Sequence, residues 1–439
     1  MVDNYYPNVL IIGHYPGDFS GVSITLKNLF FHWPPEKLSV ASSDPINKML
    51  SDRVSNYYHF GHKEVRIRFF SYFMKSKEAS QIYSLNDDKL FDKLKFEPIK
   101  PKSPSIKYSL SIIKKLLEKT GLLFILRKYY VSEDLLNWIN NLKPDIILTM
   151  LGDLATMDFA IEIKKKSKIK LAVYILDDWV HANPANTLLP KLWSFIFNRK
   201  FKQVLEISNI NIAICQKMAD EYRCIYRKEF IYFHNPVDIT LYKHQIKKDN
   251  NKFVISYLGK INRDTIEGLE DLVYALEMLG NTNIMLYIYP GRVPNNIKKL
   301  VSNKKNIEIK QTVPHSNIQS IYSNSDLLFL PLGFSKRSRR YTRLSMPTKI
   351  SEYMASSVPI LLYAPSEIAL SEYAIKNNFA IVVSERSSLK LKSVINDIYI
   401  GEINTDLITK NAYCLAETDH NLEFVCENFR KALTSIFDV

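Results

Sequence analysis

The feature that most constrains the fold is a regular alternation of short β-rich runs with segments of helical periodicity. Helical patterns such as 267–279 and 365–376 lie between the β-rich runs. Alternation of this kind builds βαβ units, and therefore parallel sheets with helices on both faces. Two series of runs predict an α/β protein with two doubly wound, Rossmann-like domains. The expected strands are 8–13, 145–150, 170–175, 211–214 and 230–233, and then 253–258, 283–289, 306–309, 327–330, 359–362 and 379–383.

A polar, lysine-rich stretch follows the motif HNPVD at 234–238 and separates the two series. Such a stretch is typical of an interdomain linker. We therefore predict a first domain over 1–238, a second over 239–418, and a terminal helix over 419–439 that crosses back to the first domain. Between about residues 54 and 130 the strand and helix periods conflict. We predict an insertion there, with an amphipathic helix over 107–119.

The chain of 439 residues carries 59 Lys and Arg against 45 Asp and Glu, a net charge of +14. The local excess is steepest over 100–130, where eight basic residues are opposed only by Glu118. A basic surface suits nucleic acid, an anionic membrane or a phosphorylated substrate, and charge alone does not choose among them. A basic amphipathic segment of this kind fits peripheral docking on an anionic leaflet, and a solvated surface is the alternative.

The sequence shows no membrane-spanning or secretory signal. No window approaches 18 consecutive apolar residues, and the amino terminus lacks the basic and apolar regions of a signal peptide. The four cysteines show neither a Cys-x-x-Cys pair nor histidines at zinc-ligand spacing, which predicts reduced thiols in a cytoplasmic protein. They are Cys215, Cys224, Cys414 and Cys426.

Glycine is scarce, with 12 in the chain, yet Gly13, Gly17 and Gly21 follow the first predicted strand. The carboxyl end of a strand is where an open α/β sheet binds its ligands. Ser20 or Ser23 is placed to cap the next helix, whose amino end attracts phosphate. The spacing G-x-x-x-G-x-x-x-G differs from the G-x-G-x-x-G of dinucleotide folds, which disfavours an NAD enzyme. A tight structural turn is the alternative.

A second loop, in LGKINRD, places Lys260 and Arg263 after the first strand of the second domain. A cation at about 4 Å from a phosphate contributes about 4 kcal/mol at an effective dielectric constant near 20. A helix terminus contributes at most about 2 kcal/mol. We therefore expect these side chains to be the main anchor for a diphosphate leaving group, the alternative being a solvated loop.

The segment SKRSRRYTRLSMPTKISEYMA carries the strongest pattern. We expect a helix to begin near Pro347, a residue suited to a first helical turn. Thr348 and Lys349 then place a hydroxyl and free backbone N–H groups at the helix's positive end. Glu352 projects on the same side one turn later, where its carboxylate can accept two hydrogen bonds from a ribose diol. An ordinary amphipathic helix is the alternative.

The residues before this helix form a predicted basic loop. It contains Lys336, Arg337, Arg339, Arg340 and Arg343 and no acid. We expect Arg340 and Arg343 to contribute to a phosphate or sugar site. Inside the helix, Ile350, Tyr353 and Met354 are expected to face the core.

At these motifs the sequence resembles the GT-B glycosyltransferases, in particular the retaining group of glycosyltransferase family 4. The matching stretches, in the expected order, are the opening strand with its glycine loop, ICQKMADEYRCIY with HNPVD, SYLGKI, and PTKISEYMASSVPIL. The resemblance implies two Rossmann-like domains facing across a cleft, the first for the acceptor and the second for the donor.

The same resemblance implies roles for individual residues. Thr348 and the neighbouring backbone would hold the donor diphosphate, and Glu352 the nucleoside ribose. Gly21 would close over the phosphate from the first domain, while Lys260 and Arg263 would neutralise the leaving group.

Two positions depart from the family pattern. The family often has a second Glu eight residues before Glu352, where this chain has Leu344, so sugar recognition must differ. The helix usually ends in Gly, where this chain has Ser357. If Ser357 is left-handed, that conformation costs about 1–2 kcal/mol.

A fourth motif, YILDDWVHANPAN, lies at the carboxyl end of a predicted strand in the first domain. Asp177, Asp178 and His181 are expected on the acceptor side, as catalytic or acceptor-binding groups. The family has a functional histidine or acid in this region. Helix capping is the alternative, and two adjacent carboxylates define no metal geometry by themselves.

The resemblance implies transfer of a sugar from a UDP- or GDP-sugar to a glycan or lipid-linked glycan, with retention and with neither metal nor other cofactor. We expect a role in bacterial surface polysaccharide synthesis, in the cytoplasm and peripheral on the inner face of the membrane, with no nucleic-acid partner. One alternative is a non-catalytic basic protein that binds nucleic acid or a membrane surface; it leaves the order of the motifs unexplained. The other is a GT-B epimerase that uses a UDP-sugar without an acceptor.

Overall fold

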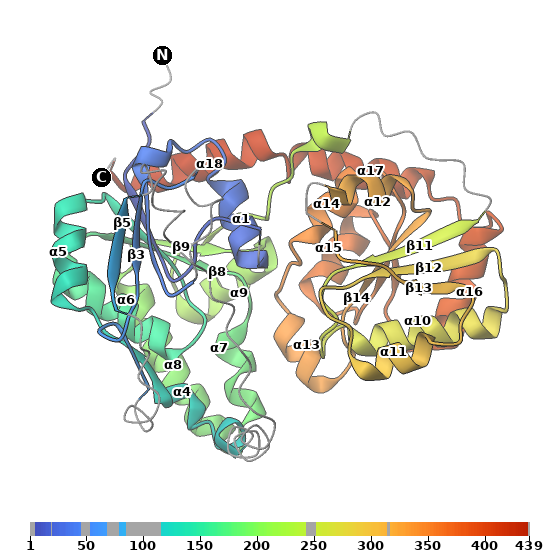
Figure 1. The fold of residues 1–439 in the computed structure, drawn as a ribbon, viewed down its shortest axis with the longest axis horizontal. Coiled ribbons are helices and arrows are strands. Elements are labelled where there is room, and N and C mark those ends of the chain that lie inside the picture. The colour runs from blue at the N-terminus through green and yellow to red at the C-terminus, as the bar shows by residue number, and fades with distance from the viewer. Residues whose placement is uncertain are drawn as a thin grey trace. The chain divides into compact units, whose positions relative to one another are not determined.

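The computed structural model describes residues 5–18, 20–44, 53–67, 79–84, 116–242, 252–313 and 317–437. The chain divides into two compact units (Figure 1). Unit 1 comprises Met1–Phe233 and Cys426–Val439, and unit 2 comprises His234–Val425. Each unit contains a predominantly parallel sheet, which confirms the predicted α/β class with two Rossmann-like sheets.

Unit 1 is built on an eight-stranded sheet in the order β10-β9-β8-β7-β1-β2-β3-β5. All neighbouring strands are parallel except β5, which is antiparallel to β3. The chain adds β2 and β3 on one side of β1 and then returns to add β7, β8, β9 and β10 on the other. The topological switch point therefore lies between β1 and β7. The strands are β1 (Val9–Ile12), β2 (Leu38–Ser42), β3 (Asn56–His59), β5 (Gln81–Ser84), β7 (Ile146–Met150), β8 (Lys170–Ile175), β9 (Ile210–Ala213) and β10 (Ile231–Tyr232).

A second, two-stranded antiparallel ribbon pairs β4 (Val65–Ile67) with β6 (Arg127–Tyr129). The predicted insertion over 54–130 thus contains two strands of the main sheet, β3 and β5, besides this ribbon. Periodicity did not reveal β3 because its four residues, Asn-Tyr-Tyr-His, neither alternate nor form an apolar run. The predicted helix over 107–119 lies mostly outside the described residues.

Helices cover the sheet of unit 1. They are α1 (Gly21–Leu29), α4 (Leu123–Leu126), α5 (Glu133–Leu142), α6 (Leu154–Ser167), α7 (Trp179–Ala182), α8 (Pro190–Ile207) and α9 (Gln216–Tyr226). Strands β1, β7 and β8 are buried almost throughout, as expected for a parallel sheet with both faces covered. This double burial is why they read as continuous apolar runs in the sequence.

The last helix, α18 (Leu422–Thr434), ends in unit 1. The ring of Phe429 meets those of Phe30 and Phe233, each at 5.3 Å between centroids. Arg430 donates a hydrogen bond to the carbonyl of Tyr5 at 3.0 Å. The C-terminal residues therefore contribute to the packing of a unit that begins at the opposite end of the chain.

Unit 2 contains a six-stranded parallel sheet in the order β13-β12-β11-β14-β15-β16, with its switch point between β11 and β14. Figure 1 shows α10, α11 and α16 on one face of this sheet and α12, α14 and α17 on the other. The strands are β11 (Phe253–Leu258), β12 (Ile284–Tyr289), β13 (Ile307–Ile309), β14 (Leu327–Pro331), β15 (Ile360–Tyr363) and β16 (Ile381–Val383). The helices are α10 (Ile266–Leu279), α11 (Asn295–Val301), α12 (Ile318–Ser323), α13 (Lys336–Thr342), α14 (Lys349–Ala355), α15 (Ala369–Asn377), α16 (Ser388–Tyr399) and α17 (Asp406–Thr418).

The close approach of α10 to the sheet depends on one glycine. A Cβ atom at Gly268 would lie 2.5 Å from the Cβ of Pro331, at the end of β14. Leu269, Leu272 and Leu276 then enter the core of unit 2. Across the described part of the chain, no helix combines the length and apolarity needed to cross a membrane.

Candidate functional site

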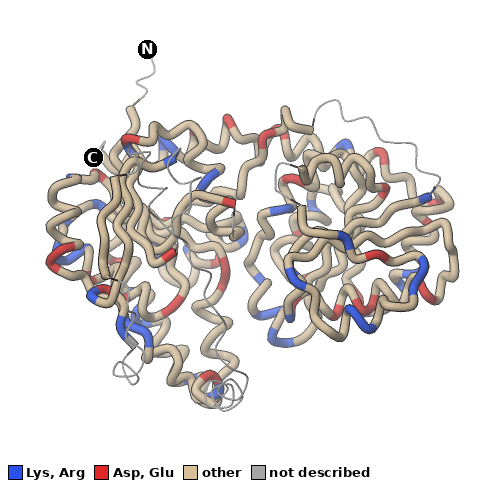
Figure 2. The backbone as a smooth tube through the Cα atoms, in the orientation of Figure 1, with Lys and Arg blue, Asp and Glu red and all other residues tan. Residues whose placement is uncertain are grey.

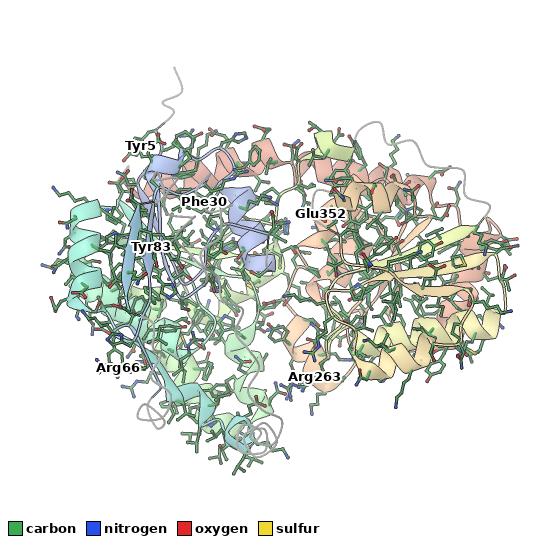
Figure 3. The ribbon with its side chains drawn as sticks, in the orientation of Figure 1. Tyr5, Phe30, Arg66, Tyr83, Arg263 and Glu352 are labelled. Carbon is green, nitrogen blue, oxygen red and sulfur yellow. The ribbon has the colours of Figure 1, made fainter. Side chains whose placement is uncertain are left out.

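Two of the sequence motifs follow the two strands that flank the switch point of unit 2. At a switch point the loops after two neighbouring strands run in opposite directions, which leaves a crevice at the carboxyl edge of the sheet. Here the loop after β11 carries Lys260 and Arg263, and the segment after β14 leads through α13 to α14, which carries Glu352. Figure 3 labels Glu352 and Arg263, which lie well apart in unit 2.

The loop after β11 has a fixed backbone and exposed cations. The carbonyl of Lys260 accepts hydrogen bonds from the Tyr257 hydroxyl at 2.7 Å and from the Thr265 hydroxyl at 3.1 Å. The side chains of Lys260 and Arg263 are both exposed. A rigid loop with two exposed cations is suited to meet an anionic ligand at little cost in loop ordering.

Lys349 differs from its predicted role, because its side chain as well as its backbone reaches the switch point. The Lys349 ammonium donates to the carbonyl of Leu258, the last residue of β11, at 2.8 Å. It also lies 4.8 Å from the ring centroid of Tyr257, in a cation–π contact. Burial lowers the pKa of Lys349 to about 8, and the Glu352 carboxylate opposes that shift.

Gly259 makes room for this ammonium. Its φ of +134° is one that residues with a side chain rarely adopt, and a Cβ there would lie 2.9 Å from the Lys349 Nζ. The backbone conformation therefore favours glycine at this position, and a side chain there would displace the Lys349 ammonium.

Glu352 is buried, with 7% of its surface exposed. One of its carboxylate oxygens accepts a hydrogen bond from the Tyr322 hydroxyl at 2.8 Å. Tyr322 stacks on Tyr242, with centroids 6.2 Å apart, and burial together with Glu352 raises its pKa well above 10. Tyr322 therefore keeps its proton and donates a hydrogen bond to the carboxylate. A carboxylate offers about four acceptor positions, of which the Tyr322 hydroxyl uses one.

A network that sequence reasoning missed holds the start of α14 in place. The side-chain amide of Asn235 donates to the Thr348 carbonyl at 2.9 Å, and the Ser351 hydroxyl donates to the Asn235 carbonyl at 2.5 Å. Ser351 also meets the Nδ1 of His420 at 3.0 Å, and burial lowers the pKa of His420 well below 6.5. The motif HNPVD, interpreted above as a domain border and as part of the family resemblance, contains Asn235, but nothing in its pattern predicted this contact.

Predictions about α14 and its ends can be checked directly. The helix begins at Lys349, two residues after Pro347, and Thr348 is its N-cap residue. Ile350, Tyr353 and Met354 are fully buried, as predicted. Ser357, after the helix, has a φ of +55°, which confirms the left-handed conformation considered for it. Leu344, where the family often has a glutamate, is 0% exposed, and its side chain is apolar.

The predicted basic loop is wrong in its backbone conformation, because Lys336–Thr342 forms the helix α13. Ser335 caps this helix by accepting from the Ser338 N–H at 3.2 Å, a cap that was not among the sequence predictions. Arg339 pairs with Glu367 at 2.8 Å. Arg340, on α13, and Arg343, just after it, are half-buried.

In unit 1 the glycine turn lies at the carboxyl end of β1, as predicted. Gly13 has a φ of +94°, and its N–H donates to the Ala41 carbonyl at 2.9 Å. Ser20, rather than Ser23, caps α1 by accepting from the Ser23 N–H at 3.2 Å. Gly21 is the first residue of α1 and is exposed.

The three candidate catalytic residues of the first domain follow β8. Asp178 is fully buried, and one carboxylate oxygen meets His181 Nδ1 at 2.6 Å and the Tyr222 hydroxyl at 2.8 Å. His181 Nε2 lies 3.2 Å from the hydroxyl of Tyr226. Asp177 is half-buried. Asp178 and His181 thus belong to a packed hydrogen-bond network that joins the loop after β8 to α9.

Among the residues that the structure describes, no three His, Cys, Asp or Glu side chains are grouped to hold a metal ion. No protein-family model and no curated protein sequence matches the chain. Several solved structures match the chain over nearly its whole length.

HepE from Anabaena, solved with UDP-glucose, is 12% identical, with 97% of this chain and 99% of that chain covered and a TM-score of 0.63. WaaG, a glycosyltransferase involved in lipopolysaccharide biosynthesis, is 11% identical, with 97% and 99% covered and a TM-score of 0.56. A putative UDP-N-acetylglucosamine 2-epimerase from Listeria monocytogenes is 10% identical, with 99% and 97% covered and a TM-score of 0.52. At such identities the likeness shows the fold alone: this chain has the GT-B fold, which confirms the fold predicted from its motifs.

Proposed function

We propose that the protein is a glycosyltransferase that moves a sugar from a nucleotide-sugar to a glycan or lipid-linked glycan. The observation that carries the proposal is the switch point of unit 2, where the buried carboxylate of Glu352 and three cations, Lys260, Arg263 and Lys349, belong to one edge of a GT-B sheet. A carboxylate suits a ribose diol, and the cations suit a diphosphate. The structure of HepE in complex with UDP-glucose supports a nucleotide-sugar as the donor.

In this proposal residues 1–238 bind the acceptor and residues 239–418 bind the donor. The acceptor hydroxyl attacks the anomeric carbon on the face from which the diphosphate leaves, so that configuration is retained. The bond from the anomeric carbon to the phosphate oxygen breaks, and that oxygen takes the proton of the acceptor hydroxyl. Lys260, Arg263 and Lys349 stabilise the negative charge that develops on the leaving diphosphate. A role in bacterial surface polysaccharide synthesis is supported by the similarity to WaaG, a glycosyltransferase involved in lipopolysaccharide biosynthesis.

The test is calorimetric binding of UDP, GDP and ADP to the wild type and to Glu352→Gln. The amide preserves the shape and can still accept from Tyr322, but it loses the charge. We expect one nucleotide to bind and the substitution to weaken it about 10- to 100-fold, the value of a hydrogen bond to a charged group. Glu277→Gln is the matched control, because Glu277 pairs with Lys304 on the surface at the end of α10.

Absence of binding by all three nucleotides would refute the proposal. A basic protein that binds nucleic acid would then become the first alternative, with binding that falls steeply as salt is added. In the described residues, however, Lys and Arg are interspersed with Asp and Glu over both units and do not gather in one stripe (Figure 2).

An epimerase is the second candidate, favoured by the likeness to the putative Listeria epimerase. It would use a UDP-sugar without any acceptor. Incubation with the nucleotide-sugar alone separates the two functions: release of an epimerised sugar supports the epimerase, whereas turnover that requires a glycan supports the transferase.

We also propose that the protein binds its acceptor at an anionic membrane surface. Two neighbouring segments of unit 1, residues 116–125 and 188–195, expose eight large apolar side chains. The segments are joined by the Leu188 N–H, which donates to the Lys119 carbonyl at 2.7 Å, and by the Trp193 Nε1, which donates to the Thr120 carbonyl at 2.8 Å. The eight are Leu116, Leu122, Leu123, Ile125, Leu188, Leu189, Leu192 and Phe195.

Exposed lysines accompany this apolar surface, namely Lys119 and Lys191. Apolar side chains beside cations fit insertion into the headgroup region of an anionic bilayer. Leu188→Ser with Phe195→Ser should reduce flotation with vesicles that contain phosphatidylglycerol. The control is Leu389→Ser with Leu407→Ser, two equally exposed leucines of unit 2. Equal flotation of both double variants, or flotation independent of the anionic lipid, would contradict this docking.

A further inference from the structure

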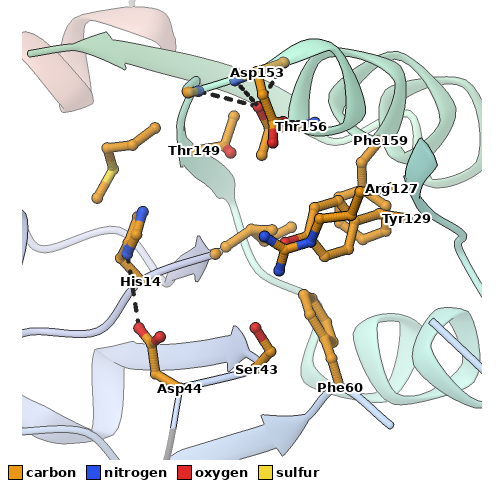
Figure 4. A pocket seen from close by; sticks show the side chains of 14 residues that line it. His14, Ser43, Asp44, Phe60, Arg127, Tyr129, Thr149, Asp153, Thr156 and Phe159 are labelled. Atoms are coloured by element: carbon orange, nitrogen blue, oxygen red, sulfur yellow. Dashed lines mark hydrogen bonds and ion pairs between the residues drawn. The ribbon is translucent and has the colours of Figure 1, made fainter. Parts of the chain in front are cut away.

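A cavity of about 260 Å³ lies at the switch point of unit 1, beside the glycine turn at Gly13 (Figure 4). The ends of β1 and β7 form two of its sides, as the switch-point rule predicts for a ligand site. Its volume is below the usual range of about 300–1,000 Å³ for sites of drug-sized ligands, which suits a single sugar unit. The lining residues that carry the argument are His14, Asp44, Arg127, Tyr129, Asp153 and Thr156.

Arg127 supplies a cation that points into the cavity. In Figure 4 its guanidinium extends from β6 into the open space, with His14 on the other side. The guanidinium lies 4.7 Å from the ring centroid of Tyr129, and the structure gives it no ion pair with any described residue. Tyr129 is itself buried against Phe60 and Phe159, with centroids 6.3 Å and 5.9 Å away. The arginine therefore rests on a rigid aromatic support with its donors available.

Asp44 supplies an acceptor on another side of the same space. Its Oδ2 is buried and accepts no hydrogen bond within the described residues, while the Nδ1 of His14 lies 3.7 Å from it. A buried carboxylate oxygen without a donor is costly, so a ligand hydroxyl placed there would be bound favourably. Asp153 is already engaged, because one carboxylate oxygen caps α6 by accepting from the Thr156 N–H at 2.8 Å.

These groups define the chemistry of the ligand. Arginine presents a planar fork of donors that matches a carboxylate or a phosphate with two hydrogen bonds. A carboxylate that lacks a donor requires a hydroxyl or an amine, and a sugar carries hydroxyls. One anionic group and at least one hydroxyl on a single small unit satisfy both sides of the cavity.

We propose that this cavity binds an acidic sugar unit of the acceptor, with its carboxylate or phosphate on Arg127 and a hydroxyl donating to Asp44. The inference rests on the proposed function in that the bound sugar is taken to be part of the acceptor. It adds a chemical class to that acceptor and assigns to the cavity residues a role in choosing it.

The test measures binding of three probes to the full chain by saturation-transfer NMR: glucuronate, glucose 6-phosphate and glucose. We expect at least one acidic probe to bind about tenfold or more tightly than glucose, since a charge-assisted pair is worth about 1.5–3 kcal/mol. The stronger of the two acidic probes identifies the anionic group as a carboxylate or a phosphate.

Arg127→Gln should abolish this preference, and Arg127→Lys should restore part of it by returning the charge without the fork. Arg66→Gln is a closely matched control. Arg66 lies on β4 of the same ribbon, is exposed, and rests on the ring of Tyr130 at 4.9 Å, but it does not line the cavity. The control should keep the wild-type preference for the acidic probe.

Three results would overturn the proposal: equal binding of acidic and neutral probes, no binding of any probe, or the same loss in Arg66→Gln as in Arg127→Gln. Nucleotide binding is measured on the same samples. If nucleotides bind normally while the acidic preference is missing, the acidic-sugar proposal alone fails. If nucleotides do not bind, the transferase proposal fails, and a preference for acidic sugars would still identify the cavity as an anion site.

Discussion

The two sheets can be compared strand by strand, because β1 and β11 occupy equivalent positions at their switch points. Each is followed by a glycine with positive φ, +94° at Gly13 and +134° at Gly259, and then by a basic residue, His14 or Lys260. The space beside the two glycines differs. A Cβ at Gly259 would lie 2.9 Å from the Lys349 ammonium, whereas a Cβ at Gly13 would have no atom within 4 Å.

This difference follows from the segments that come later in the chain. In unit 2, the side chain of Lys349 extends from α14 to the end of β11 and places a positive charge at the switch point. Among the residues described for unit 1, no side chain takes that place, and a cavity with Arg127, Asp44 and Asp153 in its lining remains. The same topology therefore yields a cationic site suited to a diphosphate and a cavity of mixed charge suited to a sugar. Topology decides where a ligand binds, and the loops decide its chemistry.

The largest expected effect comes from alanine at the two glycines. Both Gly13→Ala and Gly259→Ala force a residue with a side chain into a strained backbone, which we expect to lower the free energy of unfolding by about 1–3 kcal/mol. Only Gly259→Ala should also push Lys349 off the Leu258 carbonyl and weaken nucleotide binding about tenfold. Urea denaturation and calorimetry measure the two effects. Equal loss of nucleotide binding in both variants would contradict the difference inferred between the two switch points.

Lys349→Met tests how much the charge of Lys349 contributes to nucleotide binding, because methionine keeps most of the length of the side chain. We expect about tenfold weaker nucleotide binding. In the wild type, affinity should fall as the pH rises through about 8, since the Lys349 pKa lies there and the proton is lost above it. The variant should not show that decline, which calorimetry between pH 7 and pH 9.5 can test.

The stability of the wild type should change with pH in the opposite direction. The pKa of Lys349 is lowered from 10.5 to about 8 on folding, so the unfolded chain binds more protons between these values. The free energy of unfolding should therefore gain a contribution as the pH rises through this range, and Lys349→Met should lack it. Urea denaturation at several pH values measures the difference between the two proteins.

Lys260→Ala and Arg263→Ala should have smaller effects, because both side chains are exposed and solvent screens them. We expect about three- to tenfold weaker nucleotide binding for each, with the difference shrinking as salt is added. Lys310→Ala is the control, because Lys310 is a half-buried lysine that pairs with Glu308 on β13. A loss that does not depend on salt would indicate that the loop itself, and not its charge, had changed.

The smallest effect is expected where helices end in a left-handed residue. Ser357 in unit 2 and Lys143 in unit 1 have φ values of +55° and +48°. Glycine at either position should raise the free energy of unfolding by up to about 1 kcal/mol, by removing the strain of a side chain. Neither variant should change nucleotide affinity. A change in affinity with Ser357→Gly alone would show that the end of α14 contributes to the site.

Local pattern in the sequence determined the strands that are buried on both faces. Lys170–Ile175 and Phe253–Leu258 were predicted with the bounds they have, because a parallel strand covered by helices must be apolar along its whole length. Helical periodicity likewise placed Ile350, Tyr353 and Met354 in the core. These features depend on neighbours within one or two turns of the chain.

Which side chains from distant parts of the sequence are in contact depends on the tertiary structure alone. The position of the Lys349 ammonium depends on a carbonyl 91 residues away, and the support of α14 depends on Asn235, 113 residues before Thr348. The cavity of unit 1 joins His14, Asp44 and Arg127, which lie on separate strand ends and share no sequence pattern. Periodicity records whether a residue is buried, but not what it touches, because contacts across a sheet are set by strand order and loop path.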